Sequence, residues 1–311
     1  MVMTTNDDIF FTPYEIAEYT SDAMAKGFFV AKYMNRQQIN TDTVVTYLRP
    51  EEKVGSLISA KDKTIRPISE GTELTEIRGV ERIGKTKTLS RRGYKLVVTD
   101  EELESNAFSL QDNLNDMSYN LAYEMEKNCV NTLKAEAKAP QATGLKGKWS
   151  DDTTTITSIE SDIIDMQSAY DETDMVGDLN CFFYGTNYYN VLRKNLNREQ
   201  YRWTIEDEKG YDAYNSGAIN ALGAFHHKTK FLDDGEALGW NMNNVPATIY
   251  YKTNPTLSSA SFYDGLPEYA PFVQTYVRRT EGIVPKTEIE MAVSYAITVN
   301  KPASLLYQTG L

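Results

Sequence analysis

The longest regular pattern of hydrophobic and polar positions lies between residues 110 and 136. Apolar side chains recur there every three or four residues, at Leu110, Leu114, Met117, Leu121, Met125, Cys129 and Leu133. Polar and charged side chains fall off this stripe, at Asp112, Asn115, Glu124, Glu126 and Lys127. This period predicts an amphipathic helix. Ser109 suits its N-cap and Pro140 its end, so we expect about 27 residues spanning about 40 Å.

Other segments predict shorter helices. The first of these begins near residue 12, where the spacing suits an N-cap at Thr12, a first helical proline at Pro13 and a capping-box acid at Glu15. This helix is expected to continue to residue 34. Residues 158–170 and 187–196 also have helical periodicity. Just before the long helix, Thr99 and Glu102 form a second capping-box pattern.

Between residues 44 and 98 the pattern changes to short β-branched runs separated by glycines and charges. TVVTYL, KTIRPI, GTELTEI, KTKTL and YKLVV each predict extended chain with little continuous apolar surface, typical of a projecting hairpin or a loose loop. Further strand-like runs follow, including NCFFYG at 180–185 and SASFY at 259–263, with a loop expected at 201–216. The order of helix, β arm, long helix, mixed segment and final strands predicts an α+β fold.

Composition narrows the class of protein. Of the 311 residues, 41% are hydrophobic and 24% are charged, as in soluble globular proteins. The formal net charge of −12 argues against a surface that binds nucleic acid throughout, because such binding needs cations against phosphates. No apolar run approaches the roughly 18 residues that span a bilayer, and the acidic N-terminal residues do not resemble a signal peptide.

Candidate catalytic and metal-binding chemistry is sparse. The loop at 144–150 has a Gly-Lys pair without the spacing of a phosphate-binding loop. His226 and His227 are the only histidines, and adjacent residues of a strand point to opposite faces. Cys129 and Cys181 are expected to be free, buried thiols. We therefore predict no catalytic site, no cofactor and no metal, and keep a hydrolase with clustered carboxylates only as a third hypothesis.

A basic segment stands out from this acidic chain. Seven cations oppose a single acid, Glu81, between residues 78 and 95: Arg78, Arg82, Lys85, Lys87, Arg91, Arg92 and Lys95. They can protect a hairpin edge from unwanted strand pairing, bind nucleic acid, or contact an acidic surface of a neighbouring copy. The third interpretation suits a chain with surplus negative charge elsewhere, because a cationic arm and an anionic body are complementary.

Several motifs, taken in order, resemble the major capsid proteins of tailed double-stranded DNA viruses, which have the Hong Kong 97-type fold. Residues 70–73 (EGTE) resemble the element that opens the extended hairpin of that family, its E-loop. Residues 94–103 resemble the returning strand, with Gly93 before the tyrosine rather than after it. Residues 182–196 resemble the strand and helix of the axial domain. The end of the chain, with Pro302 followed by an alanine, resembles the family's last strand.

The resemblance implies a domain plan. An N-terminal helical arm would occupy residues 1–48, the E-loop 49–98 and the axial domain 141–245. Residues 99–140, with the long helix as the spine, and residues 246–311 would form the peripheral domain. The E-loop would lie across a neighbouring subunit, and its cations would make the contact: Arg78, Arg82, Lys85, Lys87, Arg91 and Arg92.

The same resemblance implies a function. The chain would be a non-enzymatic major capsid protein, found in the virion, that assembles in the host cytoplasm into pentamers and hexamers of an icosahedral shell around double-stranded DNA. Scaffolding, decoration and portal proteins are expected partners, packaged DNA would lie nearby without specific contacts, and no membrane is involved. The alternative within the same fold is an encapsulin-type nanocompartment that encloses an enzyme cargo.

Overall fold

A computed structural model describes most of the chain. The described residues are 13–48, 83–104, 110–145, 149, 156–171, 177–196, 219–252, 273–280 and 285–311. Residues 49–82 of the predicted hairpin, the predicted loop at 201–216 and the predicted strand at 259–263 lie outside these ranges. By its internal contacts the chain divides into two compact units: residues 1–44, 86–129 and 249–298 form unit 1, and residues 45–85, 130–248 and 299–311 form unit 2.

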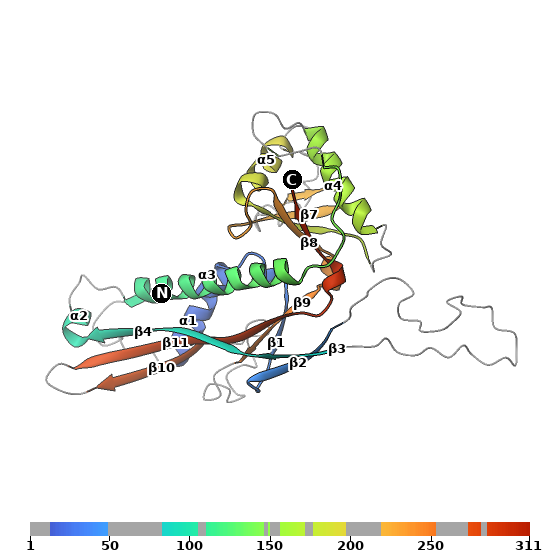
Figure 1. Ribbon diagram of the computed structural model, residues 1–311. Helices are drawn as coiled ribbons and strands as arrows, with labels where there is room; N and C mark the ends of the chain where they lie inside the picture. The colour runs from blue at the N-terminus through green and yellow to red at the C-terminus, as the bar shows by residue number, and fades with distance from the viewer. Residues whose placement is uncertain are drawn as a thin grey trace, which may run out of the picture. The chain divides into compact units, whose positions relative to one another are not determined.

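Unit 1 is a β-sheet with helices (Figure 1). Its elements are α1 (Pro13–Lys26), η1 (Ala31–Tyr33), β1 (Asn35–Gln38), β4 (Ser90–Thr99), α2 (Asp100–Glu104) and β10 (Val273–Thr280), with most of α3 (Leu110–Glu136), β9 (Ala247–Lys252) and β11 (Lys286–Val299). The strand order is β1-β9-β11-β10, and β4 also pairs with β11. A separate two-stranded sheet pairs β2 (Thr43–Leu48) with β3 (Ile83–Thr88).

The strand β11 organises unit 1. It pairs antiparallel with β4 from Lys286 to Tyr295 and with β10 from Lys286 to Val293. Ile289, Met291 and Val293 lie on one face of this strand and are buried. The close pairing requires a glycine at position 93, because a Cβ there would lie 2.3 Å from the carbonyl oxygen of Met291.

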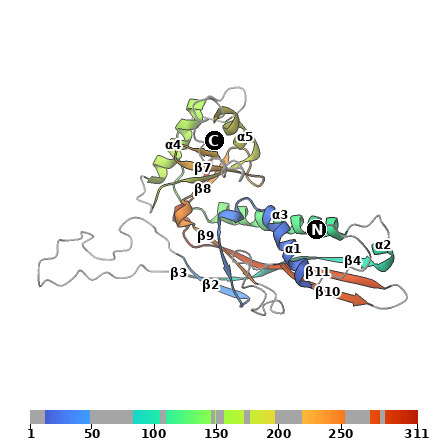
Figure 2. The same cartoon turned by 180° about the vertical axis from the view of Figure 1, so that it is seen from behind.

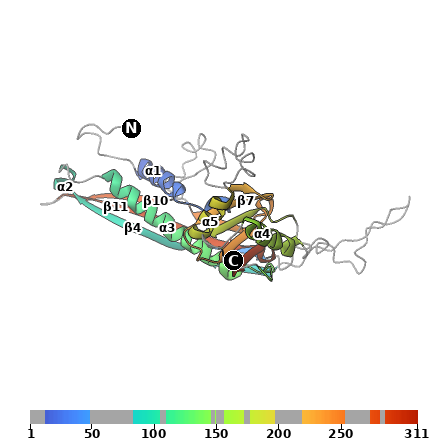
Figure 3. The same cartoon turned by 90° about the horizontal axis from the view of Figure 1, so that it is seen from above.

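The helix α3 confirms the predicted long helix, with 27 residues from Leu110 to Glu136. The views from the side and from above agree that it runs alongside β4 and β11 (Figures 1 and 3). Asn128 Nδ2 donates a hydrogen bond of 2.6 Å to the hydroxyl of Tyr295 on β11. The predicted N-cap, Ser109, lies outside the described residues.

The capping box before α2 is confirmed. The backbone N–H of Thr99 donates to Glu102 Oε2 at 2.9 Å, and the N–H of Glu102 donates to Thr99 Oγ1 at 3.3 Å. Hydrogen bonds from Thr99 lower the pKa of the Glu102 carboxyl. The reciprocal pair satisfies N–H groups that the start of a helix leaves without partners.

The first helix is shorter than predicted. It begins at Pro13 as expected, but it ends at Lys26 rather than near residue 34. Gly27 follows, and there the chain passes so close to α3 that an added Cβ would lie 2.8 Å from Ala122 Cβ. The apolar residues beyond it form the short turn η1 instead. Figure 2 shows α1 from behind, and Ser21 Oγ accepts a hydrogen bond from the N–H of Val273 on β10.

Unit 2 is a mixed sheet covered by helices on one face. Its strands are β5 (Cys181–Gly185), β6 (Ile219–Ala221), β7 (Ala224–Thr229), β8 (Glu236–Trp240) and β12 (Leu305–Thr309), in the order β12-β8-β5-β7-β6. The pair β5–β7 is parallel, and the pairs β12–β8, β5–β8 and β6–β7 are antiparallel. The helices α4 (Ile156–Asp171) and α5 (Thr186–Leu196) and the short turns η2 (Met242–Asn244) and η4 (Pro302–Ser304) complete it.

The core of unit 2 confirms the two predicted helices and the predicted strand. Ile159, Ile163 and Met166 of α4 are fully buried, as their spacing predicts. They belong to one cluster with Phe182 and Tyr184 of β5. All five residues of β5 are buried, as the apolar run NCFFYG indicates.

Two of the predicted segments are joined by strand pairs to other parts of the chain. The strand β4 lies within the predicted hairpin of residues 49–98, yet it pairs with β11 in the sheet of unit 1, because ten consecutive residue pairs join the two strands. Residues 299–311 were assigned with the peripheral segments, yet they belong to unit 2, because β12 pairs with β8. Both strand pairs join segments that are distant in the sequence.

Candidate subunit-contact residues

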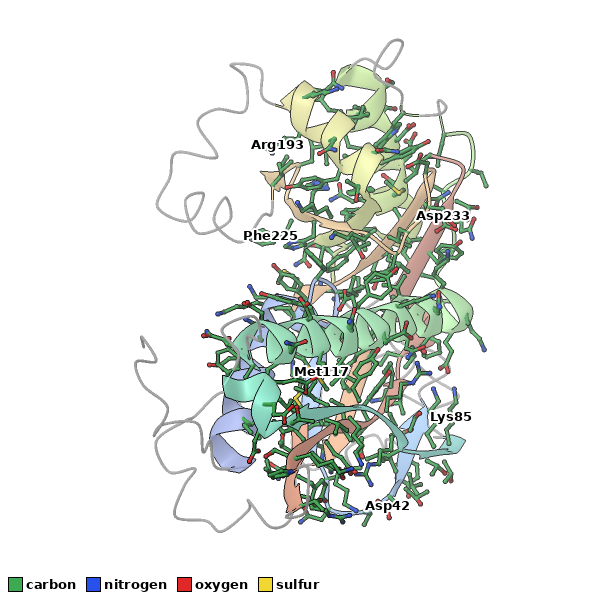
Figure 4. The ribbon with its side chains drawn as sticks, turned by 90° about the vertical axis from the view of Figure 1, so that its left-hand side faces the viewer. Asp42, Lys85, Met117, Arg193, Phe225 and Asp233 are labelled. Carbon is green, nitrogen blue, oxygen red and sulfur yellow. The ribbon has the colours of Figure 1, made fainter. Side chains whose placement is uncertain are left out.

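The predicted contact cations on β3 bind groups of their own chain. Lys85 Nζ lies 2.7 Å from Glu136 Oε1, at the end of α3. Lys87 Nζ donates a hydrogen bond of 2.6 Å to the backbone carbonyl of Ile297 on β11. Figure 4 labels Lys85 on its strand. Both ammonium groups therefore help to hold β3 against elements of the same chain.

The two predicted contact arginines on β4 point to opposite faces of the sheet, as adjacent strand residues do. Arg92 Nη1 forms an ion pair of 3.1 Å with Glu124 Oε2 on α3, and both side chains are about two-fifths exposed. The Arg91 guanidinium lies over the ring of Tyr276, 6.0 Å from its centroid, on the face away from α3. Arg91 and Arg92 are both exposed at the surface.

The face of the sheet that carries Arg91 is polar and charged. Lys95 Nζ lies 2.7 Å from Glu288 Oε2, and Lys286 Nζ lies 2.9 Å from Glu288 Oε1. Hydrogen bonds from Lys95 and then from Lys286 lower the pKa of Glu288 to about 2. Tyr276 and Val97 are 42% and 45% exposed on the same face. It therefore presents charges and exposed apolar groups together.

The role assigned to these cations stays a prediction. Arg78 and Arg82 lie outside the described residues, so the structure describes only four of the six. Of these four, Lys85 and Lys87 bind groups of the chain itself, and Arg91 and Arg92 keep exposed guanidinium groups beside their partners. The two arginines are therefore the residues best placed to contact another molecule.

Some exposed apolar residues escaped the sequence analysis. On β2, Val45 and Tyr47 are each 59% exposed. The alternate residues of the strand, Val44 and Thr46, are buried. Tyr119 and Tyr123 are 47% and 50% exposed, four residues apart on α3. Successive side chains of a strand point to opposite faces, so the run TVVTYL could have indicated that one of its two faces is exposed.

The two histidines lie on opposite faces of β7 in unit 2, as expected. The ring of His226 stacks on Phe182 and that of His227 on Phe183, with centroids 5.4 Å and 5.0 Å apart. The Tyr184 hydroxyl lies 3.2 Å from His226 Nδ1, and burial lowers the pKa of His226 to about 4. Both cysteines are free and buried. Among the described residues no group of metal-ligating side chains has converged.

One buried carboxylate contradicts the sequence analysis. Glu126 was placed off the apolar stripe of α3, but it is fully buried. Its Oε1 accepts a hydrogen bond from the N–H of Val30, and its Oε2 accepts one of 3.1 Å from the N–H of Ala31. Burial raises the pKa of Glu126 to about 7, although these hydrogen bonds act in the opposite direction. Two donors brought from another segment explain why a carboxylate is tolerated there.

The described part of the chain contains no helix that is both long and apolar enough to cross a membrane. No protein-family model matches the sequence, and no curated protein matches it.

Solved structures do match this fold. The virus-like particle protein from Pyrococcus furiosus has a TM-score of 0.55 at 10% identity, over 95% of this chain and 98% of that one. The capsid protein of cyanophage P-SCSP1u has a TM-score of 0.55 at 11% identity, over 100% and 93%. The SrpI encapsulin of Synechococcus elongatus PCC 7942 has a TM-score of 0.52 at 10% identity, over 90% and 86%.

The chain has the fold of these proteins. It is a mixed α+β structure that matches Hong Kong 97-type capsid structures, and the α+β prediction is confirmed at that level. The match covers nearly the full length of both chains in each comparison, so it is not confined to one shared unit.

Proposed function

We propose that this chain is a structural shell protein whose copies assemble into a closed, capsid-like particle. The observation that carries the proposal is the match in fold, over nearly the whole chain, to a virus-like particle protein and to a phage capsid protein. The proposed activity is assembly rather than catalysis. Contacts between unlike surfaces of identical copies generate rings when the rotation closes, and such rings are the pentamers and hexamers expected here.

The proposal gives each part of the chain a role. The helix α3 serves as the spine of a peripheral domain made of residues 99–140 and the sheet strands of residues 246–298. Residues 141–245 form the axial domain, together with residues 299–311, whose strand β12 pairs with β8. Residues 1–48 form the N-terminal arm, and residues 49–98 the E-loop, whose last strand, β4, pairs with β11.

Within this plan, Arg91 and Arg92, which lie on opposite faces of the sheet, each contact acidic groups of neighbouring copies. Their exposure supports this assignment, and so does the contrast between these cations and the net charge of −12. Replacing both with glutamate is expected to abolish particle formation, since like charges at an interface repel. Particles of normal yield from the double variant would contradict the assignment.

A matched control separates this effect from a damaged fold. Arg92→Glu alone also removes the ion pair with Glu124. In the double exchange Arg92→Glu with Glu124→Arg, the pair is rebuilt with reversed charges on the two residues. If the contact between copies depends on Arg92, this exchanged variant should fold as the wild type does and still assemble poorly.

We propose that the enclosed material is a double-stranded DNA genome, which would place the chain in a virion assembled in the host cytoplasm. Scaffolding, decoration and portal proteins would then be its partners. The second candidate is a nanocompartment with a protein cargo, which the match to the SrpI encapsulin favours. One fold is thus compatible with two kinds of content.

The contents of isolated particles decide between the two. Particles sedimented from a natural source of the chain are treated with nuclease, then opened and analysed for protected DNA and for co-purifying protein. Protected double-stranded DNA of uniform length supports the capsid. A stoichiometric enzyme without protected DNA supports the nanocompartment, and the absence of any particle contradicts the shell proposal itself.

A further inference from the structure

The outer edge of β4 is left open in the sheet of unit 1. In the described part of the chain, β4 pairs with β11 and with no other strand. Its residues are exposed from Ser90 to Lys95 and again at Val97. An accessible edge strand of this length offers a row of backbone N–H and C=O groups to another polypeptide.

The register of β4 against β11 shows which backbone groups lie on this edge. The N–H of Asp100 donates to the carbonyl of Pro285 at 3.1 Å and continues the register of the two strands. Hydrogen-bonded positions alternate along an antiparallel pair, so every second residue before Asp100 also turns its N–H toward β11. The residues between them turn their backbone groups to the open edge: Arg91, Gly93, Lys95 and Val97. Thr99 has the same direction, and its N–H donates to Glu102 Oε2 at 2.9 Å.

Cationic side chains flank this edge on both faces of the sheet. Arg91 and Lys95 lie on the face away from α3, and Arg92 lies on the face of α3. A partner that covers only one face of the sheet cannot reach both arginines. Successive side chains of a strand point to opposite faces, so one extended segment beside β4 presents side chains to both. The pair of arginines therefore fits a partner strand with acidic side chains.

The charge of the chain indicates where such a segment can come from. A net charge of −12 makes a second copy complementary to the cationic edge. The strands at the two ends of the sheet do not fit, because β10 has two arginines and no acid, and β1 has Arg36 and no acid. Cations on edge strands oppose the direct pairing of such edges. The acidic segment therefore comes from outside these two strands.

We propose that the open edge of β4 pairs with an extended acidic segment of a neighbouring copy, which adds a strand to the sheet of unit 1. Main-chain hydrogen bonds give this kind of contact its affinity, and alternate side chains give it specificity. Arg91 and Arg92 then meet acids of the same segment, one on each face. The inference rests on the proposed shell function and deepens it, because it makes the backbone of β4 part of the contact.

Hydrogen exchange at single-residue resolution tests the pairing, in particles of the full-length chain and in the unassembled chain. The amides of Tyr94 and Leu96 point to β11 and should be protected in both states. The amides of Lys95 and Val97 should gain protection on the order of tenfold or more in particles. Equal exchange of these two amides in both states would overturn the proposal. A wild-type chain that forms no particles would instead contradict the shell function, and this contact with it.

A proline on the open edge is the matched variant. Val97→Pro removes one N–H from the edge and no hydrogen bond between β4 and β11, and edge strands tolerate proline. Its particle yield should fall on the order of tenfold, because a main-chain hydrogen bond of the added strand is lost. Val97→Ala keeps the N–H and also loses the exposed valine side chain, so it should assemble as the wild type does.

A second proline variant separates assembly from folding. Leu96→Pro removes an N–H that points to β11, so it should lower the urea midpoint of the unassembled chain more than Val97→Pro does. A folded Val97→Pro chain that forms particles with the yield of Val97→Ala would overturn the proposal. If Val97→Pro does not fold, the exchange of Lys95 and Val97 in the wild type still decides whether the edge is paired.

Discussion

The central strand of unit 2 and the long edge strand of unit 1 are opposites in burial. All five residues of β5 are buried, and its rings stack with those of neighbouring strands. Most of β4 is exposed, and it is held by strand pairing, ion pairs and the fit of Gly93 against β11. Unit 2 thus owes its stability to an apolar core. Unit 1 keeps a polar, accessible strand, β4, at the edge of its sheet.

The largest expected effect tests the core side of this comparison. Phe182→Ala removes a ring that stacks 5.9 Å from Tyr184 and 5.4 Å from His226. We expect the free energy of unfolding to fall by about 3–5 kcal/mol, as for large-to-small changes in a core. Urea unfolding followed by tryptophan fluorescence measures it in unit 2, because Trp149, Trp203 and Trp240 all belong to that unit.

The control for this variant is Phe225→Ala on the adjacent strand. Phe225 is 36% exposed, so its loss should change the same transition much less. Equal losses in the two variants would mean that stacking against Tyr184 and His226 does not stabilise unit 2, and the contrast between the two strands would lose its basis.

The next effect tests strand pairing in unit 1. In Gly93→Ala the new Cβ would lie 2.3 Å from Met291 O, so β4 must shift away from β11. We expect a loss of about 1–3 kcal/mol in the free energy of unfolding, as for overpacking. Circular dichroism should report this loss more strongly than tryptophan fluorescence, which follows unit 2. Gly84→Ala on β3, where an added Cβ meets nothing within 4 Å, should be nearly neutral.

The smallest effect tests the charges on the open face of the same sheet. Hydrogen bonds from Lys95 and Lys286 lower the pKa of Glu288 from 4.5 to about 2. Its contribution to stability is therefore present above pH 4.5 and is lost as pH falls to about 2. Urea midpoints of the wild type and Glu288→Gln should differ slightly at about pH 6 and converge at about pH 2. A difference that stays constant over this range would show that the ion pairs contribute nothing.

The sequence predicts the elements of this fold better than their pairing. The stripe of α3, the buried face of α4 and the capping box at Thr99 are local patterns, and the structure confirms them. The pairing of β4 with β11 joins segments almost 200 residues apart, and nothing within either segment specifies its partner. The assignment of β12 to unit 2 depends on β8 in the same way.

The candidate contact residues show a second limit. The cationic segment is visible in the sequence, but which cations remain accessible depends on tertiary partners such as Glu136 and the carbonyl of Ile297. Glu126 is the opposite case, a charged residue that the structure buries. A charged residue type suggests an exposed position, and only the N–H groups of Val30 and Ala31, nearly 100 residues earlier, explain its burial.

Cryo-electron microscopy of the purified full-length chain tests the central claim most directly. The account predicts closed shells of uniform diameter, with rings of five or six copies and α3 packed along the β4–β11 sheet in every copy. In such a reconstruction Arg91 or Arg92 should face a carboxylate of an adjacent copy. A chain that remains monomeric, or forms only small open oligomers at every concentration and pH tested, would contradict it.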